Sequence, residues 1–217
     1  MECSERDDRP HPPDGRVTRR GRGHRERYEW CVERPSIDYA ALASDLPPAQ
    51  LGRAILDALG DRYSGGHAAC SLVEFAQSGA TYLFDLASAV GGAQEDRTVA
   101  AWTVAPAVVG RRDVVYQRNF PLPPDPDGTP VDRGHLIPHL SGGEFGPNIF
   151  RQHRALNRGW SEQGKRFRAL EREAAVPGTF YFGHLVYADD SAYPVMIETG
   201  LLRNGSLHVE IFRNRGH

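Results

Sequence analysis

The sequence predicts an α+β fold with a mainly antiparallel central sheet and flanking helices. Short segments rich in Val, Ile, Thr, Tyr and Phe, bounded by Gly, Pro and Asn, occur in both halves of the chain and are typical of strands. Other segments carry apolar residues at helical spacing. The 217 residues, 40% of them hydrophobic, are enough for one core and too few for two large ones.

The first 27 residues predict a disordered, Arg-rich tail. They contain eight arginines, six acidic residues and three prolines, and almost nothing that a core would bury. We expect this tail to contribute at most a non-specific attraction to phosphate groups.

Residues 28–79 are predicted to form a helical N-terminal region, to which the sequence assigns no role. Between Ser44 and Gly60, early prolines, apolar residues at helical spacing and a closing glycine predict a short helix. A second helix is predicted over residues 67–77, with its few apolar residues turned inward.

The next segments predict strands and one long loop. Residues 81–87 and 98–104, separated by a Gly-Gly pair and a polar turn, predict a β-hairpin. Residues 114–117 predict a third strand. Residues 119–130 contain five prolines, so an extended loop is expected there. This loop leads directly into the tetrapeptide at residues 132–135.

A helical pattern runs from Pro147 to about Ala175 and has one apolar and one basic face. At about 100° per residue, five cations share a sector away from the apolar face: Arg151, Arg154, Arg158, Lys165 and Arg168. The pattern predicts a phosphate-binding surface along this helical segment.

Three final strands are predicted over residues 179–187, 194–201 and 206–212. The pair Asn204-Gly205 predicts the turn between the last two.

Charge and cysteine content restrict the class of protein. The formal net charge is −2, which excludes a polycation that coats nucleic acid or an anionic membrane by charge alone. The three cysteines, Cys3, Cys31 and Cys70, lie far apart and form no CxxC pair. The chain shows no apolar window long enough for a membrane span, so we expect a cytoplasmic protein, or one exported without a classical signal peptide, and no membrane partner.

The tetrapeptide Asp132-Arg133-Gly134-His135 is followed in order by Gln152, Leu156-Asn157 and Ala169-Leu170-Glu171. This ordered set resembles the DNA/RNA non-specific endonuclease family, the Asp-Arg-Gly-His nucleases with the ββα-metal fold. The resemblance covers roughly residues 80–213. It implies a ββα-metal nuclease domain over residues 80–217, with the active site formed where the 132–135 strand faces the following helix.

The resemblance also implies the chemistry. His135 would be the general base that takes a proton from the attacking water, a role that suits an imidazole near neutral pH. Arg133 would contact the phosphate. Asn157 would bind Mg²⁺, with Mn²⁺ as the alternative ion, and water would complete the coordination. Asp132 and Gln152 would have supporting roles. The substrates would be DNA and RNA, and the products would carry 5′ phosphates.

One position departs from the family pattern. The family has a glutamate eight residues beyond the asparagine, where this chain has Lys165. A six-residue insertion would move the role of the family's glutamate to Glu171. In one unbroken helix, however, Asn157 and Glu171 would lie about 21 Å apart, which is too far to share one hydrated ion. The chain must therefore break between them, with Gly159 and Gly164 as candidates. Glu162 is the competing candidate if no break occurs.

The remaining phosphate contacts are predicted from position. Arg154 and Arg158 belong to the basic face, and the family's upstream arginine matches Arg118, or else Arg111 or Arg112.

Three alternatives stay open. The altered glutamate spacing fits a catalytically impaired module that only binds nucleic acid. A zinc site at His135, His139 and His153 is the second alternative. The third is a bacterial toxin domain that an immunity protein inhibits. The oligomeric state is not predicted.

Overall fold

The computed structural model describes residues 34–42, 45–67, 69–110, 113–122 and 128–215. The predicted Arg-rich tail at residues 1–27 lies outside these ranges, as do Arg111 and Arg112.

A six-stranded antiparallel sheet forms the centre of the molecule and confirms the α+β class. Its strand order is β1-β2-β3-β6-β7-β8, and every neighbouring pair is antiparallel. The strands are β1 (Leu72–Gln77), β2 (Ala80–Asp85), β3 (Arg97–Val104), β6 (Phe180–Val186), β7 (Met196–Arg203) and β8 (Ser206–Arg213). The sequence placed the boundary between the N-terminal region and the predicted nuclease domain at residues 79 and 80. Because β1 pairs with β2, this boundary falls inside a hairpin of the central sheet.

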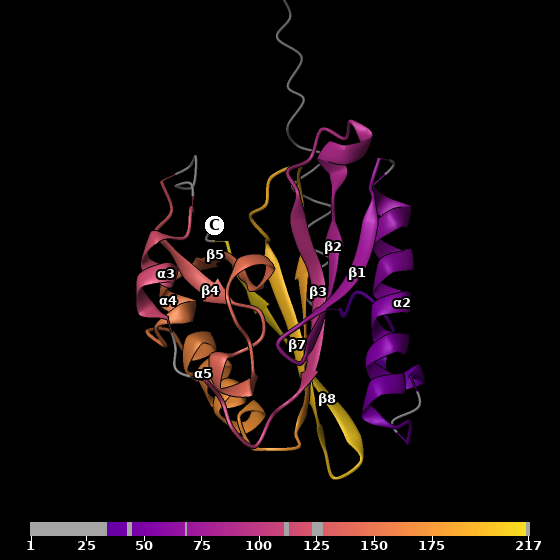
Figure 1. Cartoon of the computed structure of the whole chain (residues 1–217), viewed down its shortest axis with the longest axis vertical. Helices are drawn as coiled ribbons and strands as arrows, with labels where there is room; N and C mark the ends of the chain where they lie inside the picture. Colours follow the sequence, from indigo (N-terminus) through magenta and orange to yellow (C-terminus); the bar gives the residue numbers. More distant parts are fainter. Residues whose placement is uncertain (1–33, 43–44, 68, 111–112, 123–127, 216–217) are drawn as a thin grey trace, which may run out of the picture.

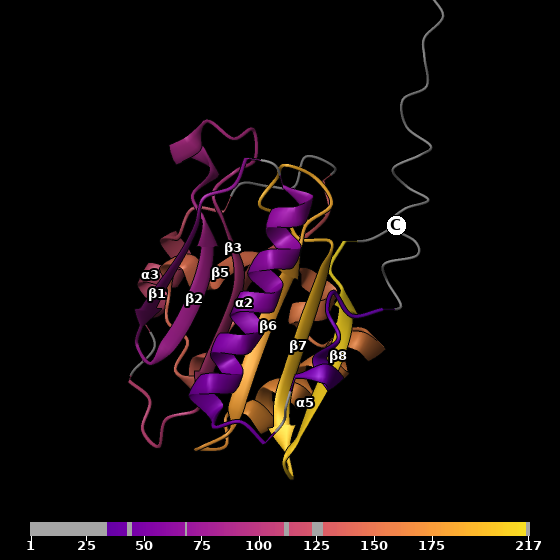
Figure 2. The same ribbon diagram turned by 90° about the vertical axis from the view of Figure 1, so that its right-hand side faces the viewer.

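Helix α2 (Pro48–Gly66) covers one face of the sheet (Figures 1 and 2). It contains the predicted helix and extends beyond it. Leu51, Ile55 and Leu59 are fully buried against the sheet. The helix lies so close to β3 that a Cβ on Gly52 would come within 2.3 Å of the Trp102 ring. Two short 3-10 turns also belong to this part of the chain: η2 (Tyr39–Ala41) precedes α2, and η3 (Ala87–Val90) follows β2.

The other face carries a second, two-stranded sheet and the remaining helices (Figure 1). Strand β4 (Val131–His135) pairs antiparallel with β5 (Ile149–His153), and the helices are α3 (Val114–Asn119), α4 (Arg154–Asn157) and α5 (Glu162–Ala174). Two 3-10 turns, η4 (His139–Ser141) and η5 (Gly146–Asn148), lie between β4 and β5.

Two contacts fix this layer on the central sheet. Leu136 directly follows β4 and packs on Gly183 of β6. A Cβ added at Gly183 would lie 2.4 Å from the Leu136 side chain. Phe167 of α5 meets Phe212 of β8 edge to face, with ring centroids 5.2 Å apart. The residues that follow the tetrapeptide are therefore packed into the core.

Two predicted elements in the first half of the chain are wrong. Residues 72–77 form β1 instead of a helix, because Val73, Phe75 and Gln77 alternate with more exposed residues along an edge strand. Residues 114–117 belong to α3 instead of a strand, because the Asp113 side chain caps the backbone N–H groups of Val115 and Tyr116.

The helical pattern predicted from residue 147 is wrong in its first part. Residues 149–153 form β5, which is buried from Ile149 to Gln152 and so shows no alternation of apolar and polar residues. Trp160, an apolar residue within this pattern, lies between α4 and α5 and is 65% exposed.

The C-terminal strands confirm the prediction. They are β6, β7 and β8, and Asn204 and Gly205 both adopt positive φ in the turn between the last two.

Candidate active site

The tetrapeptide occupies the last four residues of β4, and the alternation of a strand divides its side chains between two faces. Arg133 and His135 pair with Arg151 and Ile149 of β5 and share one face of the hairpin. Asp132 pairs with Gln152 and lies on the opposite face.

Asp132 joins the strand to the helix that follows the hairpin. Its carboxylate accepts hydrogen bonds from Arg154 Nε at 3.0 Å, Asn157 Nδ2 at 3.2 Å, and Arg158 Nε at 2.7 Å and Nη2 at 3.1 Å. Partial burial by itself would raise the pKa of Asp132, but the hydrogen bonds from Arg158, Asn157 and Arg154 outweigh it and lower the pKa below its usual value. Asp132 therefore stays ionised and holds α4 against β4.

The break that Glu171 requires is present, and both candidate glycines are part of it. Helix α4 ends at Asn157, and Gly159 has a φ of +70°, a conformation that favours glycine. Gly164, in the first turn of α5, packs on α4 so closely that a Cβ would lie 2.6 Å from the carbonyl oxygen of Ala155. The first glycine ends α4, and the second lets α5 touch it.

His135 is 8% exposed and lies beside an aromatic cluster. Its ring centroid is 5.9 Å from that of Phe145, which is in turn 5.0 Å from Tyr116 of α3. Tyr116 of helix α3 is therefore linked to His135 through Phe145. Arg118, in the last turn of α3, is exposed and forms no ion pair within the described part of the chain.

Arg133 is half-buried, and its Nε donates to the carbonyl oxygen of Phe120 at 2.7 Å. This bond fixes the guanidinium on the same hairpin face as His135. The predicted proline-rich loop, of which Phe120 is part, thus supports Arg133.

The two candidate glutamates differ in their surroundings. Glu162 lies at the start of α5, 88% exposed at its side chain, and pairs with Lys165 at 2.5 Å. The hydrogen bond from Lys165 lowers the pKa of Glu162. Glu171, in the second half of α5, is half-buried.

The predicted basic helix face does not form as one surface. Arg151 is on β5, 6% exposed, and its Nη1 lies 3.3 Å from Glu95 Oε2. Arg154 and Arg158 bind Asp132, although their side chains remain 40% and 47% exposed. Arg158 also lies over the Trp160 ring at 5.0 Å. The sequence did not indicate that Asp132 is the partner of both arginines.

The need for glycine at position 134 follows from its close contact with Gln152, a diagonal neighbour on β5. A Cβ at Gly134 would lie 2.5 Å from Cβ and 2.4 Å from Oε1 of Gln152, whose side chain is 1% exposed. The close approach of these two residues requires glycine in the tetrapeptide, and it gives Gln152 a packing role.

Replacing Gly134 with alanine is expected to destabilise the protein by about 1–3 kcal/mol, because the new methyl group overpacks against Gln152. Urea unfolding measures the change. Gly65→Ala is the matched control, because Gly65 lies in α2 with open space around it and alanine favours helix by up to about 1 kcal/mol. Equal stability of Gly134→Ala and wild type would contradict the packing argument.

The donor set suits a hard cation better than zinc. A carboxylate only accepts hydrogen bonds, so the amide nitrogen of Asn157 must face Asp132. The amide oxygen of Asn157 therefore points away from Asp132. Oxygen is the ligand atom that Mg²⁺ prefers. Among the described residues, no three His, Cys, Asp or Glu side chains form a metal-binding group, and His153 and His135 lie at opposite ends of the hairpin. The arrangement disfavours zinc at His135, His139 and His153.

No protein-family model matches the chain, and no curated protein has significant sequence similarity to it. None of the helices in the described ranges is long and apolar enough to cross a membrane.

Proposed function

We propose that this protein is a Mg²⁺-dependent endonuclease that hydrolyses the phosphodiester bonds of DNA and RNA without sequence preference. The observation that carries the proposal is the order of elements around Asp132-Arg-Gly-His135. A β-hairpin bearing this tetrapeptide leads directly into a helix, and Asp132 of the hairpin holds Asn157 of the helix at 3.2 Å. This is the succession of strand, strand and helix that a ββα-metal nuclease requires.

In the proposed reaction, His135 removes a proton from a water molecule as its oxygen attacks the phosphorus. The bond from phosphorus to the 3′ oxygen breaks, and the 3′ oxygen takes a proton from solvent. The products are a 5′ phosphate and a 3′ hydroxyl. The buried position of His135 next to Phe145 keeps its ring in one place, which favours a general base.

The arginines have different tasks. Arg133, fixed through its Nε by the Phe120 carbonyl, presents the rest of its guanidinium to the phosphate. Arg118 is the second phosphate contact, because its helix borders His135 and it is exposed. Arg154 and Arg158 position Asp132, and through it Asn157, and their exposed parts add positive charge for the incoming strand.

Asn157 would bind the metal through its amide oxygen, and Glu171 would hold water molecules of the hydrated ion. Glu171 is preferred over Glu162, because the chain breaks at Gly159 and because Glu162 is paired with Lys165 on an exposed surface. When bound, the ion stabilises the additional negative charge on the phosphate and on the leaving 3′ oxygen.

A catalytically impaired nucleic-acid-binding module is the second candidate. The observation that favours it is Lys165, a cation in the position where the family has its glutamate.

One assay distinguishes the two candidates. Purified protein is incubated with plasmid DNA and with total RNA, in Mg²⁺, in Mn²⁺ and in EDTA. The proposal predicts degradation of both substrates with either ion and none in EDTA. Intact substrates under both ions, together with retarded migration of the nucleic acid, would instead establish a binding module.

A further inference from the structure

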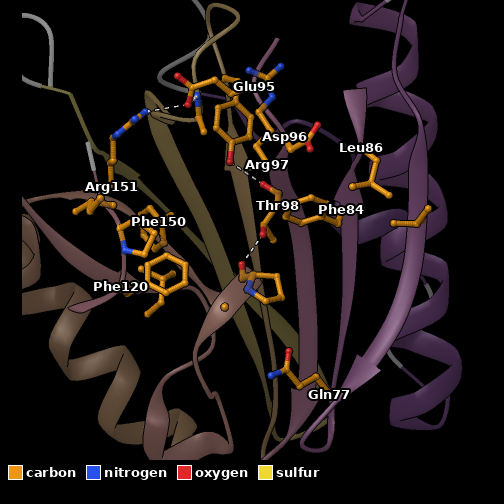
Figure 3. A pocket seen from close by; sticks show the side chains of 18 of the residues that line it. Gln77, Phe84, Leu86, Glu95, Asp96, Arg97, Thr98, Phe120, Phe150 and Arg151 are labelled. Atoms are coloured by element: carbon orange, nitrogen blue, oxygen red, sulfur yellow. Dashed lines mark hydrogen bonds and ion pairs between the residues drawn. The ribbon is translucent and has the colours of Figure 1, made fainter. Parts of the chain in front are cut away.

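A cleft of about 620 Å³ lies between the edge of the central sheet and the β4–β5 hairpin. One wall belongs to β1, β2 and β3, and the other to β5 and the segment after α3. Figure 3 shows Phe84 and Leu86 on one side of the cleft and Phe120 and Phe150 on the other. The volume lies within the range of about 300–1,000 Å³ that is typical of ligand sites.

The sheet wall of the cleft is apolar and incompletely covered. Val73, Phe75 and Phe84 are only half-buried, although they lie on the sheet face that carries the hairpin and α5. Phe75 and Phe84 meet edge to face at 6.5 Å. A flat apolar ligand between the walls would cover these rings.

Most polar groups of the cleft lie at its two ends, and the Thr98 hydroxyl on the wall between them is bonded to the Pro147 carbonyl. Gln77 is at one end, and Glu95, Arg97 and Arg151 are at the other (Figure 3). Arg97 is 2% exposed, and its guanidinium is already bound to Tyr63 Oη of α2 and to the carbonyl oxygens of Asp189 and Ser191. Glu95 and Arg151 therefore supply the polar groups at this end. A ligand with apolar faces and polar edges matches this distribution, and a nucleobase has both.

The cleft lies next to the candidate active site, because two of its lining residues contact or pair with residues of that site. Ile149, which lines the cleft, is the cross-strand partner of His135. Phe120, which lines the same wall, accepts the hydrogen bond from Arg133 through its carbonyl oxygen. A strand whose phosphate is held by Arg133 would therefore pass the mouth of the cleft, and the cationic side chains around the hairpin complement its charge.

We propose that the cleft binds one unstacked base of the substrate strand, so that the preferred substrate is single-stranded or locally unpaired nucleic acid. The inference rests on the proposed nuclease function and adds its substrate class. Phe84 stacks on the base from the sheet side, and Phe120 and Phe150 close over it from the hairpin side. Stacking of this kind tolerates every base, which agrees with cleavage that lacks sequence preference.

The test compares a short fluorescent oligothymidylate with an abasic oligomer of the same length, both bound in EDTA so that no cleavage occurs. Wild type is expected to bind the base-bearing strand more tightly, and Phe84→Leu, which keeps an apolar side chain but removes the ring, is expected to reduce its affinity roughly 5- to 150-fold. Phe84→Tyr should restore the preference. Val176→Ala, at an exposed position after α5, is the control and should bind as wild type does.

Equal affinity of wild type for the two oligomers, or an unchanged preference in Phe84→Leu, would overturn the base-binding cleft. Parallel cleavage in Mg²⁺ separates this outcome from failure of the proposed function. Cleavage without a base preference removes only the cleft proposal, and a base preference without cleavage removes only the nuclease proposal. A duplex of the same sequence should bind more weakly than the single strand, and an oligoribonucleotide shows whether RNA bases are also accepted.

Discussion

Replacing His135 with alanine is expected to lower the rate of Mg²⁺-dependent cleavage by about 10²- to 10⁴-fold, the usual contribution of a general base. The loss follows because no other group on the same hairpin face can take the proton from water: Arg133 remains charged, and Ile149 is apolar. Initial rates on a plasmid and on an oligonucleotide measure the effect. His208→Ala, at an exposed position on the edge strand β8, is the matched control.

The pH profile gives His135 a second test. Wild-type activity should fall on the acid side as the imidazole is protonated, and the residual activity of His135→Ala should lack this decline. Cleavage by His135→Ala at the wild-type rate, or an acid limb shared by both proteins, would contradict the assignment of His135 as the base.

Replacing Glu198 with alanine is expected to destabilise the fold by about 3–5 kcal/mol, the cost of removing one partner from a buried pair. Glu198 is fully buried on β7 and pairs with His184 Nδ1 at 3.0 Å. It also accepts hydrogen bonds from Tyr39 Oη at 2.7 Å and from the backbone N–H and hydroxyl of Ser36 at 2.7 and 2.9 Å. Urea unfolding measures the loss. Glu210→Ala is the control, because Glu210 forms only a partly exposed pair with Arg166 and such pairs contribute about 1 kcal/mol or less.

The same carboxylate predicts an acid limit to stability. Burial alone would raise the pKa of Glu198, but the hydrogen bond and charge of His184, with the bonds from Tyr39 and Ser36, lower it below the ordinary value of 4.5. A carboxyl group whose pKa is lower in the folded than in the unfolded protein stabilises the fold at pH values above its unfolded pKa. This stabilisation is lost as the pH falls through its pKa in the folded protein. The unfolding free energy of wild type should therefore decline below about pH 4, and a smaller decline is expected in Glu198→Ala. Equal declines in both proteins would contradict the role of Glu198.

The sequence was sufficient where local signals identify an element, even for β6 and β7, which are buried on both faces. Helix α2 and strands β6 to β8 were predicted because their apolar spacing, their prolines or the turn at Asn204-Gly205 identify them locally. β5 was missed because both of its faces are covered, so that Arg151 and Gln152 are buried among apolar neighbours. No periodicity distinguishes such a strand from a buried turn of helix.

The sequence was enough to propose residues for the candidate site, but not to predict how they are connected. The spacing of Asn157 and Glu171 required a break, and Gly159 provides it. The pairing of Asp132 with Arg154 and Arg158 depends on β5 placing α4 beside β4. The cleft was not predictable, because each of its walls includes a strand, β1 or β5, whose pattern suggested a helix.

The most direct measurement of the central claim is the initial rate of oligonucleotide cleavage as a function of Mg²⁺ concentration, for wild type and for Asn157→Ala. Wild type should show no cleavage in EDTA and a rate that saturates with Mg²⁺. Asn157→Ala should need at least roughly 10-fold more Mg²⁺ for half its maximal rate, because the amide oxygen that Asp132 orients is lost. Equal Mg²⁺ dependence of the two proteins, or cleavage that continues in EDTA, would contradict a metal-dependent centre built on the β4–β5 hairpin and α4.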